Sequence, residues 1–166
     1  RQIKAVQSYT LPDSGIAYTV GLLHSIGKIL INHYHSMYPL PVLETLEEPL
    51  CPAKERELWN FDNREAGASL LEKWHFEKSI TLPILHQDDP LETPGDRPLA
   101  CLLALVTYAV HSLPKSALRS DPQSLREEFQ PNPTYMEIVG ISKKDFLEGI
   151  GASVRDFQKL SSNLSV

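Results

Sequence analysis

The chain has 166 residues, of which 42% are apolar and 22% charged, as in an ordinary globular protein with a sizeable core. Its formal net charge of −5 argues against a broad basic face for nucleic acid. Two cysteines, Cys51 and Cys101, are too few for a disulfide scaffold, so we expect free, buried thiols in a reducing cytosol. No apolar run follows the first residues, which argues against a signal peptide.

The first predicted helix runs from about Ile16 to Asn32 and follows a turn at residues 11–15. Its apolar residues recur at helical spacing and predict a buried face. That face consists of Tyr18, Leu22, Ile26 and Ile29. Gly21 and Gly27 lower the helix propensity, so we expect them to permit the close approach of another helix or of a ligand.

The prolines in residues 38–53 predict a connection rather than a helix or a central strand, with a short helical turn near residues 43–47. Residues 54–59 predict another helical piece. Asp62 then supplies a cap for the next helix, and Glu65, three residues later, can complete a capping box.

The capped helix carries an apolar stripe of Ala66, Leu70 and Trp74, with Trp74 expected to be an anchor in the core. A further helix is predicted over residues 77–86, where Pro83 predicts a kink or a later start. Its inward residues are expected to be Ile80, Ile84 and Leu85.

Residues 87–97 form a polar loop, in which Asp96 together with Pro98 predicts the start of an apolar helix that ends near Leu113. This helix is shorter than the roughly 20 apolar residues that span a bilayer, so we expect a buried core helix. Further helices are predicted over residues 121–129 and 134–139, the latter followed by a left-handed cap at Gly140.

The last predicted helix opens at Ser142. Its core face is expected to consist of Phe146, Ile150, Val154, Phe157 and Leu160. No alternating apolar run between hairpin turns is evident anywhere in the chain. The sequence therefore predicts an all-α protein of several short and medium helices.

Three sequence blocks occur in one order along the chain. They are residues 21–28 (GLLHSIGK), 64–74 (REAGASLLEKW) and 84–90 (ILHQDDP). Together with residues 140–146 (GISKKDF), they resemble the HDOD domain, the HD-related output domain of bacterial signalling proteins. The first block is shared with many proteins of the HD superfamily, whereas the second is more specific to HDOD domains.

The resemblance spans about residues 16–160. It implies an all-α, multi-helix domain like those of the HD superfamily, in a cytoplasmic bacterial protein with a regulatory role. HDOD domains usually begin with another helical half. We therefore expect residues 16–160 to be the C-terminal part of such a domain, with the N-terminal half missing from this chain. The resemblance implies no known reaction.

Carried over position by position, the resemblance retains few metal ligands of the HD phosphohydrolases. His24 matches the first ligand, and His86 matches the first residue of a later His-His pair. The other positions carry Ser25, Asn63, Gln87 and Thr107 where Asp or His is expected. Because metal-dependent hydrolysis needs several charged or imidazole ligands, the resemblance implies a degenerate metal site without a catalytic residue, a bound metal or a cofactor.

The remaining candidates for a ligand-binding site are His24, Ser25, Lys28 and His86. Lys28 follows His24 by four residues and can share its helix face. The resemblance to phosphohydrolases implies that a lysine there suits a phosphate. We favour plainer roles for three of them. His24 would be a core histidine held by a hydrogen bond, His86 a helix-end residue near the dipole, and Lys28 a solvated lysine.

We expect a non-catalytic signal-transduction module that binds a signalling protein partner, an attached sensor or receiver domain, or a nucleotide-like ligand, and neither nucleic acid nor a membrane. Two alternatives stay open. The first is a residual metal-dependent phosphohydrolase or phosphodiesterase, in which Asp88 or Asp89 completes a metal site with His24 and His86. The second is a regulatory half that acts only with its missing N-terminal part.

Overall fold

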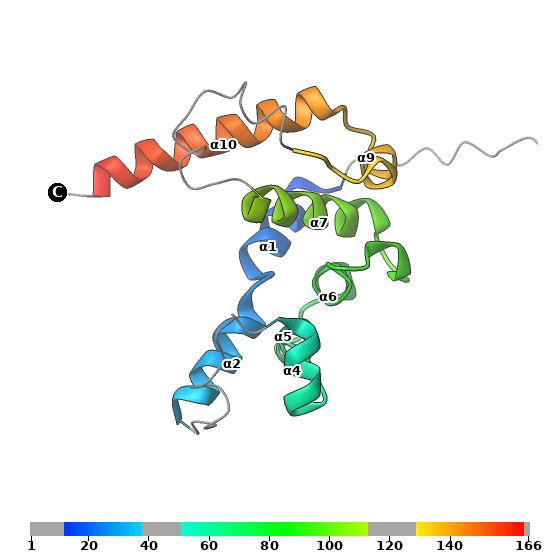
Figure 1. Ribbon diagram of the computed structural model, residues 1–166, viewed down its shortest axis with the longest axis vertical. Helices are drawn as coiled ribbons and strands as arrows, with labels where there is room; N and C mark the ends of the chain where they lie inside the picture. Colours follow the sequence, from blue (N-terminus) through cyan, green and yellow to red (C-terminus); the bar gives the residue numbers. More distant parts are fainter. Residues whose placement is uncertain (1–11, 38–50, 113–128, 165–166) are drawn as a thin grey trace, which may run out of the picture. The chain divides into compact units, whose positions relative to one another are not determined.

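The computed structural model describes residues 12–37, 51–112 and 129–164, except for the side chains of residues 35–37, 157, 158 and 160–164 (Figure 1). The described residues form helices joined by short loops and contain no strand, which confirms the all-α prediction. The helices are α1 (Ser14–Leu23), α2 (Ile26–Met37), α4 (Pro52–Trp59), α5 (Asn63–Lys73), α6 (Lys78–Leu85), α7 (Arg97–Ser112), α9 (Pro133–Val139) and α10 (Lys143–Leu164), with a 3-10 turn at Pro90–Glu92. The predicted turn at 43–47 and almost all of the predicted helix 121–129 lie outside the described residues.

The chain divides into two compact units. The first is Pro12–Leu103, and the described part of the second begins at Ala104. In the first unit, α5 packs against α2, α4 and α6, and α1 packs against α6. The buried core of this unit consists of Val20, Leu71, Ile84, Leu99 and Leu103. All the candidate site residues except Thr107 belong to the first unit.

The buried face of α1 and α2 differs from the predicted one. Of the four predicted residues, Ile26 packs against the core, whereas Tyr18, Leu22 and Ile29 are 73%, 68% and 63% exposed. Val20 and Ile31 are buried instead. Apolar residues lie on nearly every side of these two helices, so their spacing is compatible with more than one buried face. The structure buries the face that contains Gly27, because this face can approach α5 most closely.

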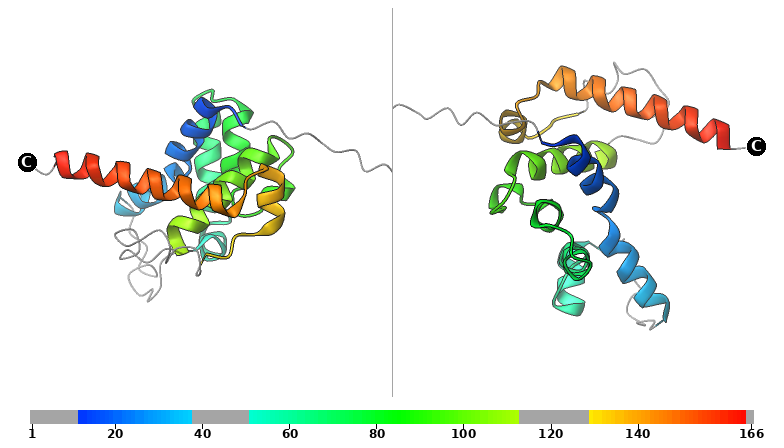
Figure 2. Two further views of the ribbon diagram at one scale, coloured as in Figure 1. Left: turned by 90° about the horizontal axis from the view of Figure 1, so that it is seen from above. Right: turned by 180° about the vertical axis from the view of Figure 1, so that it is seen from behind.

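A break at His24 and Ser25 divides the predicted helix 16–32 into α1 and α2, as the view from behind shows (Figure 2). The backbone N–H of Lys28 donates a hydrogen bond of 3.0 Å to the carbonyl oxygen of Ser25, three residues earlier. This tighter turn starts α2. The periodicity of the apolar residues continues across residues 24 and 25, so the sequence pattern did not predict the break.

The Asp62 capping box at the start of α5 is present as predicted. The Asp62 side chain accepts hydrogen bonds from the backbone N–H groups of Arg64 and Glu65, and the Glu65 side chain accepts one from the backbone N–H of Asp62. The predicted inward stripe of α5, Ala66, Leu70 and Trp74, was wrong by one position. The helix buries Gly67 and Leu71 instead.

Trp74 is not the predicted core anchor, because 56% of its surface is exposed. It is the C-cap residue of α5, one position beyond the last helical residue, Lys73. The rotation of α5 that presents Gly67 to α2 leaves Trp74 outside the core.

Helices α6 and α7 start close to their predicted positions. Pro83 lies inside α6, and Ile84 is fully buried as expected. The Asp96 side chain accepts a hydrogen bond of 3.0 Å from the backbone N–H of Leu99, which confirms it as the cap of α7. Both cysteines are free, as predicted, but only Cys101 is buried, whereas Cys51 is exposed. Burial raises the pKa of Cys101 to about 11 against the opposing charge of Arg97, so this thiol stays protonated at neutral pH.

The second unit is held by aromatic packing. Phe129 is buried, and its ring centroid lies 5.5 Å from that of Tyr108 and 5.6 Å from that of Phe146. Gly140 ends α9 with a φ of 71°, the predicted left-handed cap. Ser142 accepts a hydrogen bond from the backbone N–H of Asp145 and thereby begins α10.

Among the described residues, one helical run, Ser14–Tyr34, has the length and apolar composition that could cross a membrane. Core helices of soluble proteins and signal sequences share these properties, so the run is weak evidence for a membrane span.

The crossing of α2 and α5 depends on two glycines. A Cβ atom added to Gly27 would lie 1.7 Å from the carbonyl oxygen of Asn63 and 2.8 Å from the backbone nitrogen of Gly67. A Cβ added to Gly67 would lie 3.1 Å from the backbone nitrogen of Gly27. Both obstacles are backbone atoms, so no side-chain rotation can relieve them. The backbones therefore touch, and only glycine fits at position 27.

We predict that Gly27→Ala destabilises the first unit by about 2–4 kcal/mol, because the added methyl forces α2 away from α5. Urea unfolding followed by circular dichroism measures this loss. Gly21→Ala is the matched control, since a Cβ at Gly21 meets nothing within 4 Å. The control should be neutral or stabilising by up to about 1 kcal/mol. Equal stability of the two variants would contradict the close crossing.

Candidate functional site

The break between α1 and α2 holds three of the predicted site residues. His24 is half-buried, and its Nδ1 donates a hydrogen bond of 2.7 Å to the carbonyl oxygen of Gly21 in its own helix. Ser25 is half-buried, and Lys28 is exposed. The hydrogen bond agrees with the plainer role expected for His24, but the side chain is half-buried rather than in the core, and the exposure of Lys28 agrees with a solvated lysine. A ligand-binding role for these residues stays a prediction.

Asn63 lies directly opposite Gly27, at the first position of α5. Its backbone N–H and its side-chain amide both donate hydrogen bonds of 2.7 Å to Glu55 Oε2. Both residues are buried. The resemblance implies a histidine ligand at position 63, and the structure shows the Asn63 amide bonded to a carboxylate from α4.

Asp62, the preceding residue, is fully buried and forms the centre of an ionic cluster. Arg56 Nε donates to Asp62 Oδ2 at 2.9 Å, and Arg64 donates to both carboxylate oxygens. Arg56 also pairs with Glu65 at 3.2 Å. Every charge in this cluster therefore has an opposite charge beside it, as buried charges require.

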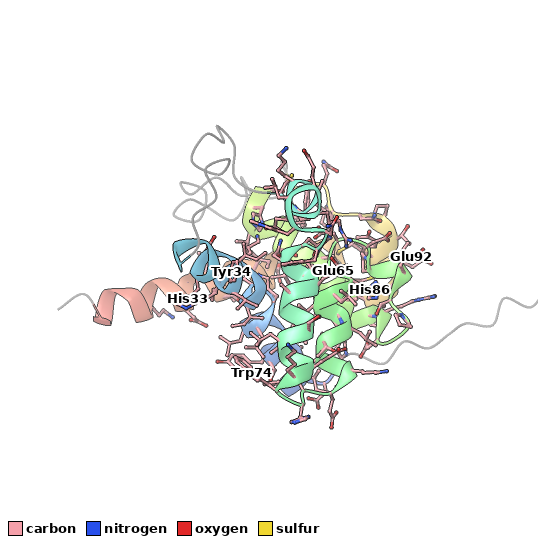
Figure 3. The ribbon with its side chains drawn as sticks, turned by 90° about the horizontal axis from the view of Figure 1, so that it is seen from below. His33, Tyr34, Glu65, Trp74, His86 and Glu92 are labelled. Atoms are coloured by element: carbon pink, nitrogen blue, oxygen red, sulfur yellow. The ribbon has the colours of Figure 1, made fainter. Side chains whose placement is uncertain are left out.

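Arg64 extends the cluster toward the loop that follows α6. Its second terminal nitrogen binds Asp88 Oδ2. His86, the C-cap residue of α6, is half-buried in the same loop, and the neighbouring Gln87 is buried. Figure 3 labels His86, which follows α6, and Glu65, in the first turn of the neighbouring helix α5. The Arg64–Asp88 pair thus ties the second candidate histidine's loop to the start of α5.

The structure brings together some of the predicted positions. The contact of Gly27 with Asn63 brings the segment that contains Ser25 and Lys28 to the start of α5. The Arg64–Asp88 pair brings the loop of His86 to the same end of α5. Thr107 belongs to the second unit, where its hydroxyl donates to the carbonyl oxygen of Ala104 at 3.2 Å. Within the described ranges, no three His, Cys, Asp or Glu side chains are placed to hold a metal ion.

The cluster shifts two pKa values. Burial tends to raise the pKa of Asp62, but the hydrogen bonds from Arg64 and the Glu65 backbone and the charges of both arginines outweigh it, so this pKa lies below its ordinary value. Burial tends to lower the pKa of Arg64, and Asp62, Asp88 and Glu55 together raise it. Both groups are fully ionised at neutral pH.

Sequence reasoning identified Asp62 and Glu65 only as a capping box and missed the rest of the cluster. Glu55 was part of an unremarkable helical piece, and its buried bond to Asn63 has no local sequence signature. Asp88 is 24 positions from Arg64, a separation beyond the reach of helical periodicity. Only the tertiary crossing of the helices unites these residues.

Comparison with known families gives one match. The family model described as HDOD domain matches residues 3–90, which is more than half of the chain. The matched range includes His24, Ser25, Asn63 and His86. No curated protein and no solved structure matches the chain significantly.

We predict that Asp62→Asn destabilises the protein by about 2 kcal/mol at pH 7, because the cap and the partner of two arginines are weakened. A carboxyl whose pKa is lower in the folded state stabilises above its ordinary pKa, here 3.8, and this contribution disappears as the pH falls through the folded pKa. The stability difference between wild type and variant should therefore shrink below about pH 4.

Urea unfolding at pH 7 and pH 3 measures both differences. Asp89→Asn, which changes an exposed carboxylate in the loop after α6, is the matched control and should alter stability little at either pH. A stability loss for Asp62→Asn that is the same at both pH values would contradict the ionic role of Asp62.

Proposed function

Because this chain belongs to the HDOD domain family, we propose that it is a non-catalytic regulatory module of bacterial signal transduction with a degenerate metal site. The observation that carries this proposal is the bonding of Asn63. An amide replaces an imidazole ligand there, and it is held by Glu55 inside the protein. A metal ion at this position would have to displace a buried hydrogen bond and would gain only a weak neutral ligand.

Ser25 and Gln87 support the same proposal. Neither residue brings the negative charge or the imidazole that a catalytic metal site uses. His24 and His86 remain as ligand types, but two imidazoles alone neither bind metal tightly nor orient an attacking water. The proposal therefore assigns His24, Ser25, Lys28 and His86 to the binding of a partner or a small ligand.

The module acts by binding, in the cytoplasm. Its partner is a signalling protein, or a sensor or receiver domain attached to the same protein, and a nucleotide-like ligand would use Lys28 for its phosphate. Lys28 is exposed, and α2 contains no Asp or Glu that could compete with a phosphate for its ammonium group. Both facts support this assignment.

We predict that the protein, purified without chelator and without a histidine tag, carries far less than stoichiometric iron, manganese or zinc. Elemental analysis of the metal content per chain measures this. A phosphodiester such as bis-p-nitrophenyl phosphate should not be hydrolysed above background when manganese is added.

The alternative function is a residual metal-dependent phosphohydrolase, and the variant His24→Ala tests whether any metal binding or hydrolysis depends on His24. If the wild type held stoichiometric metal and hydrolysed the diester, and His24→Ala lost both while remaining folded, the non-catalytic proposal would be wrong. The fold of the variant is checked by circular dichroism, since His24 also caps α1.

A further inference from the structure

The ion pair between Arg64 and Asp88 lies at the edge of the proposed binding site. It joins α5 to residues 86–92, the segment that follows α6 and begins with His86. We propose that this pair is a salt-sensitive strap, which holds the segment of His86 against α5 while the pair is closed and loosens it when the pair opens. The inference rests on the proposed function only in treating His86 as part of the binding site.

The Arg64 half of the strap is rigid. Its Nε and one terminal nitrogen donate hydrogen bonds to the two carboxylate oxygens of Asp62, which is fully buried. Only 16% of the Arg64 side chain is exposed, so the guanidinium group is held in one place without the help of Asp88. A planar fork that is already ordered loses little further freedom when it forms another hydrogen bond. The second terminal nitrogen is therefore a fixed donor for Asp88.

The Asp88 half of the strap lies at the surface. Its side chain is 57% exposed, and Arg64 is its one ion-pair partner in the described part of the chain. Salt screens the attraction between charges that water can reach. Dissolved ions, or a cationic side chain of a partner, can approach Asp88, whereas the buried Asp62 is shielded from them. The strap therefore opens on its Asp88 side, while Arg64 stays bonded to Asp62.

The other backbone hydrogen bonds of residues 86–92 are local. The N–H of His86 donates to the carbonyl oxygen of Leu82 at 3.0 Å. The N–H of Asp89 donates to the carbonyl oxygen of His86, and that of Glu92 to the carbonyl oxygen of Asp89, both at 3.1 Å. These bonds shape the turn at the end of α6 but do not join it to α5. Among the described residues, the strap is the one ion pair or hydrogen bond that does so.

Opening of the strap is a local event, because the turn is also anchored by packing. Gln87 and Pro90 are buried on either side of the exposed pair Asp88 and Asp89. These anchors stay packed when the ion pair opens, so the core of the unit remains intact. The loosening reaches His86 through the hydrogen bond that its carbonyl oxygen accepts from the N–H of Asp89.

Hydrogen exchange of the full chain tests the strap without any ligand. Asp88→Asn removes the charge and keeps the size of the side chain, so the protection factors of the amides at positions 89 and 92 should fall about threefold to tenfold. Asp89→Asn changes the neighbouring exposed carboxylate and is the matched control, which should leave the amide at position 92 unchanged. The amide of Ala100, bonded to Asp96 at the start of α7, reports on the fold of the unit and should not change in either variant.

Salt separates an ionic strap from a merely structural contact. Raising NaCl from about 0.02 M to about 0.5 M shortens the Debye length from roughly 20 Å to roughly 4 Å. Protection at positions 89 and 92 of the wild type should fall toward the values of Asp88→Asn, whereas the variant should respond little. The NMR signals of the His86 ring, recorded near pH 9 where an imidazole is neutral, should shift in Asp88→Asn and hardly in Asp89→Asn.

Three results would overturn the strap. The first is equal protection in the wild type and Asp88→Asn, and the second is an equal response of both to salt. The third is faster exchange of the Ala100 amide in Asp88→Asn, since the pair would then stabilise the whole unit rather than the turn. No metal or partner enters these measurements, so the strap can fail while the proposed function stands. Metal-dependent hydrolysis, in turn, would refute the proposed function without bearing on the exchange rates.

Discussion

The contact between the backbones of α2 and α5 is the constraint on which the first unit depends. Gly27 lies against Asn63 and Gly67 so closely that no other residue fits at position 27. This contact decides which side of α1 and α2 is buried, and so leaves Tyr18, Leu22 and Ile29 in solvent. It also fixes the rotation of α5, which places Trp74 outside the core.

The same crossing brings the start of α5 to the centre of a polar cluster. Buried carboxylates are tolerated only when hydrogen-bond donors or positive charges compensate them. Asp62 is paired with two arginines, and Glu55 accepts two hydrogen bonds from Asn63. The cluster links α4, α5 and the loop of His86. Asn63, where the resemblance implies a metal-binding histidine, thereby serves the internal bonding of the fold, and this supports our proposal that the site binds a partner or ligand.

The sequence predicted features whose causes are local. The Asp62 capping box, the Asp96 cap, the left-handed Gly140 and the all-α class all follow from neighbouring residues, and the structure confirms them. The predicted buried face of α1 and α2 was wrong for Tyr18, Leu22 and Ile29, because apolar residues lie on more than one side of these helices, whereas Ile26 does pack against the core. The Glu55–Asn63 and Arg64–Asp88 bonds were not foreseen, since they form only when separate helices meet. The role of His24, Ser25, Lys28 and His86 stays a prediction.

A zinc titration followed by NMR would test the central claim most directly, because it observes the two candidate histidines and the Asn63 amide together. The account predicts that the ring signals of His24 and His86 do not shift together with stoichiometric zinc. It also predicts that the Asn63 side-chain amide, held by Glu55, keeps its position and its slow exchange with water. Joint shifts of both rings that saturate at stoichiometric zinc, with release of the Asn63 amide, would contradict it.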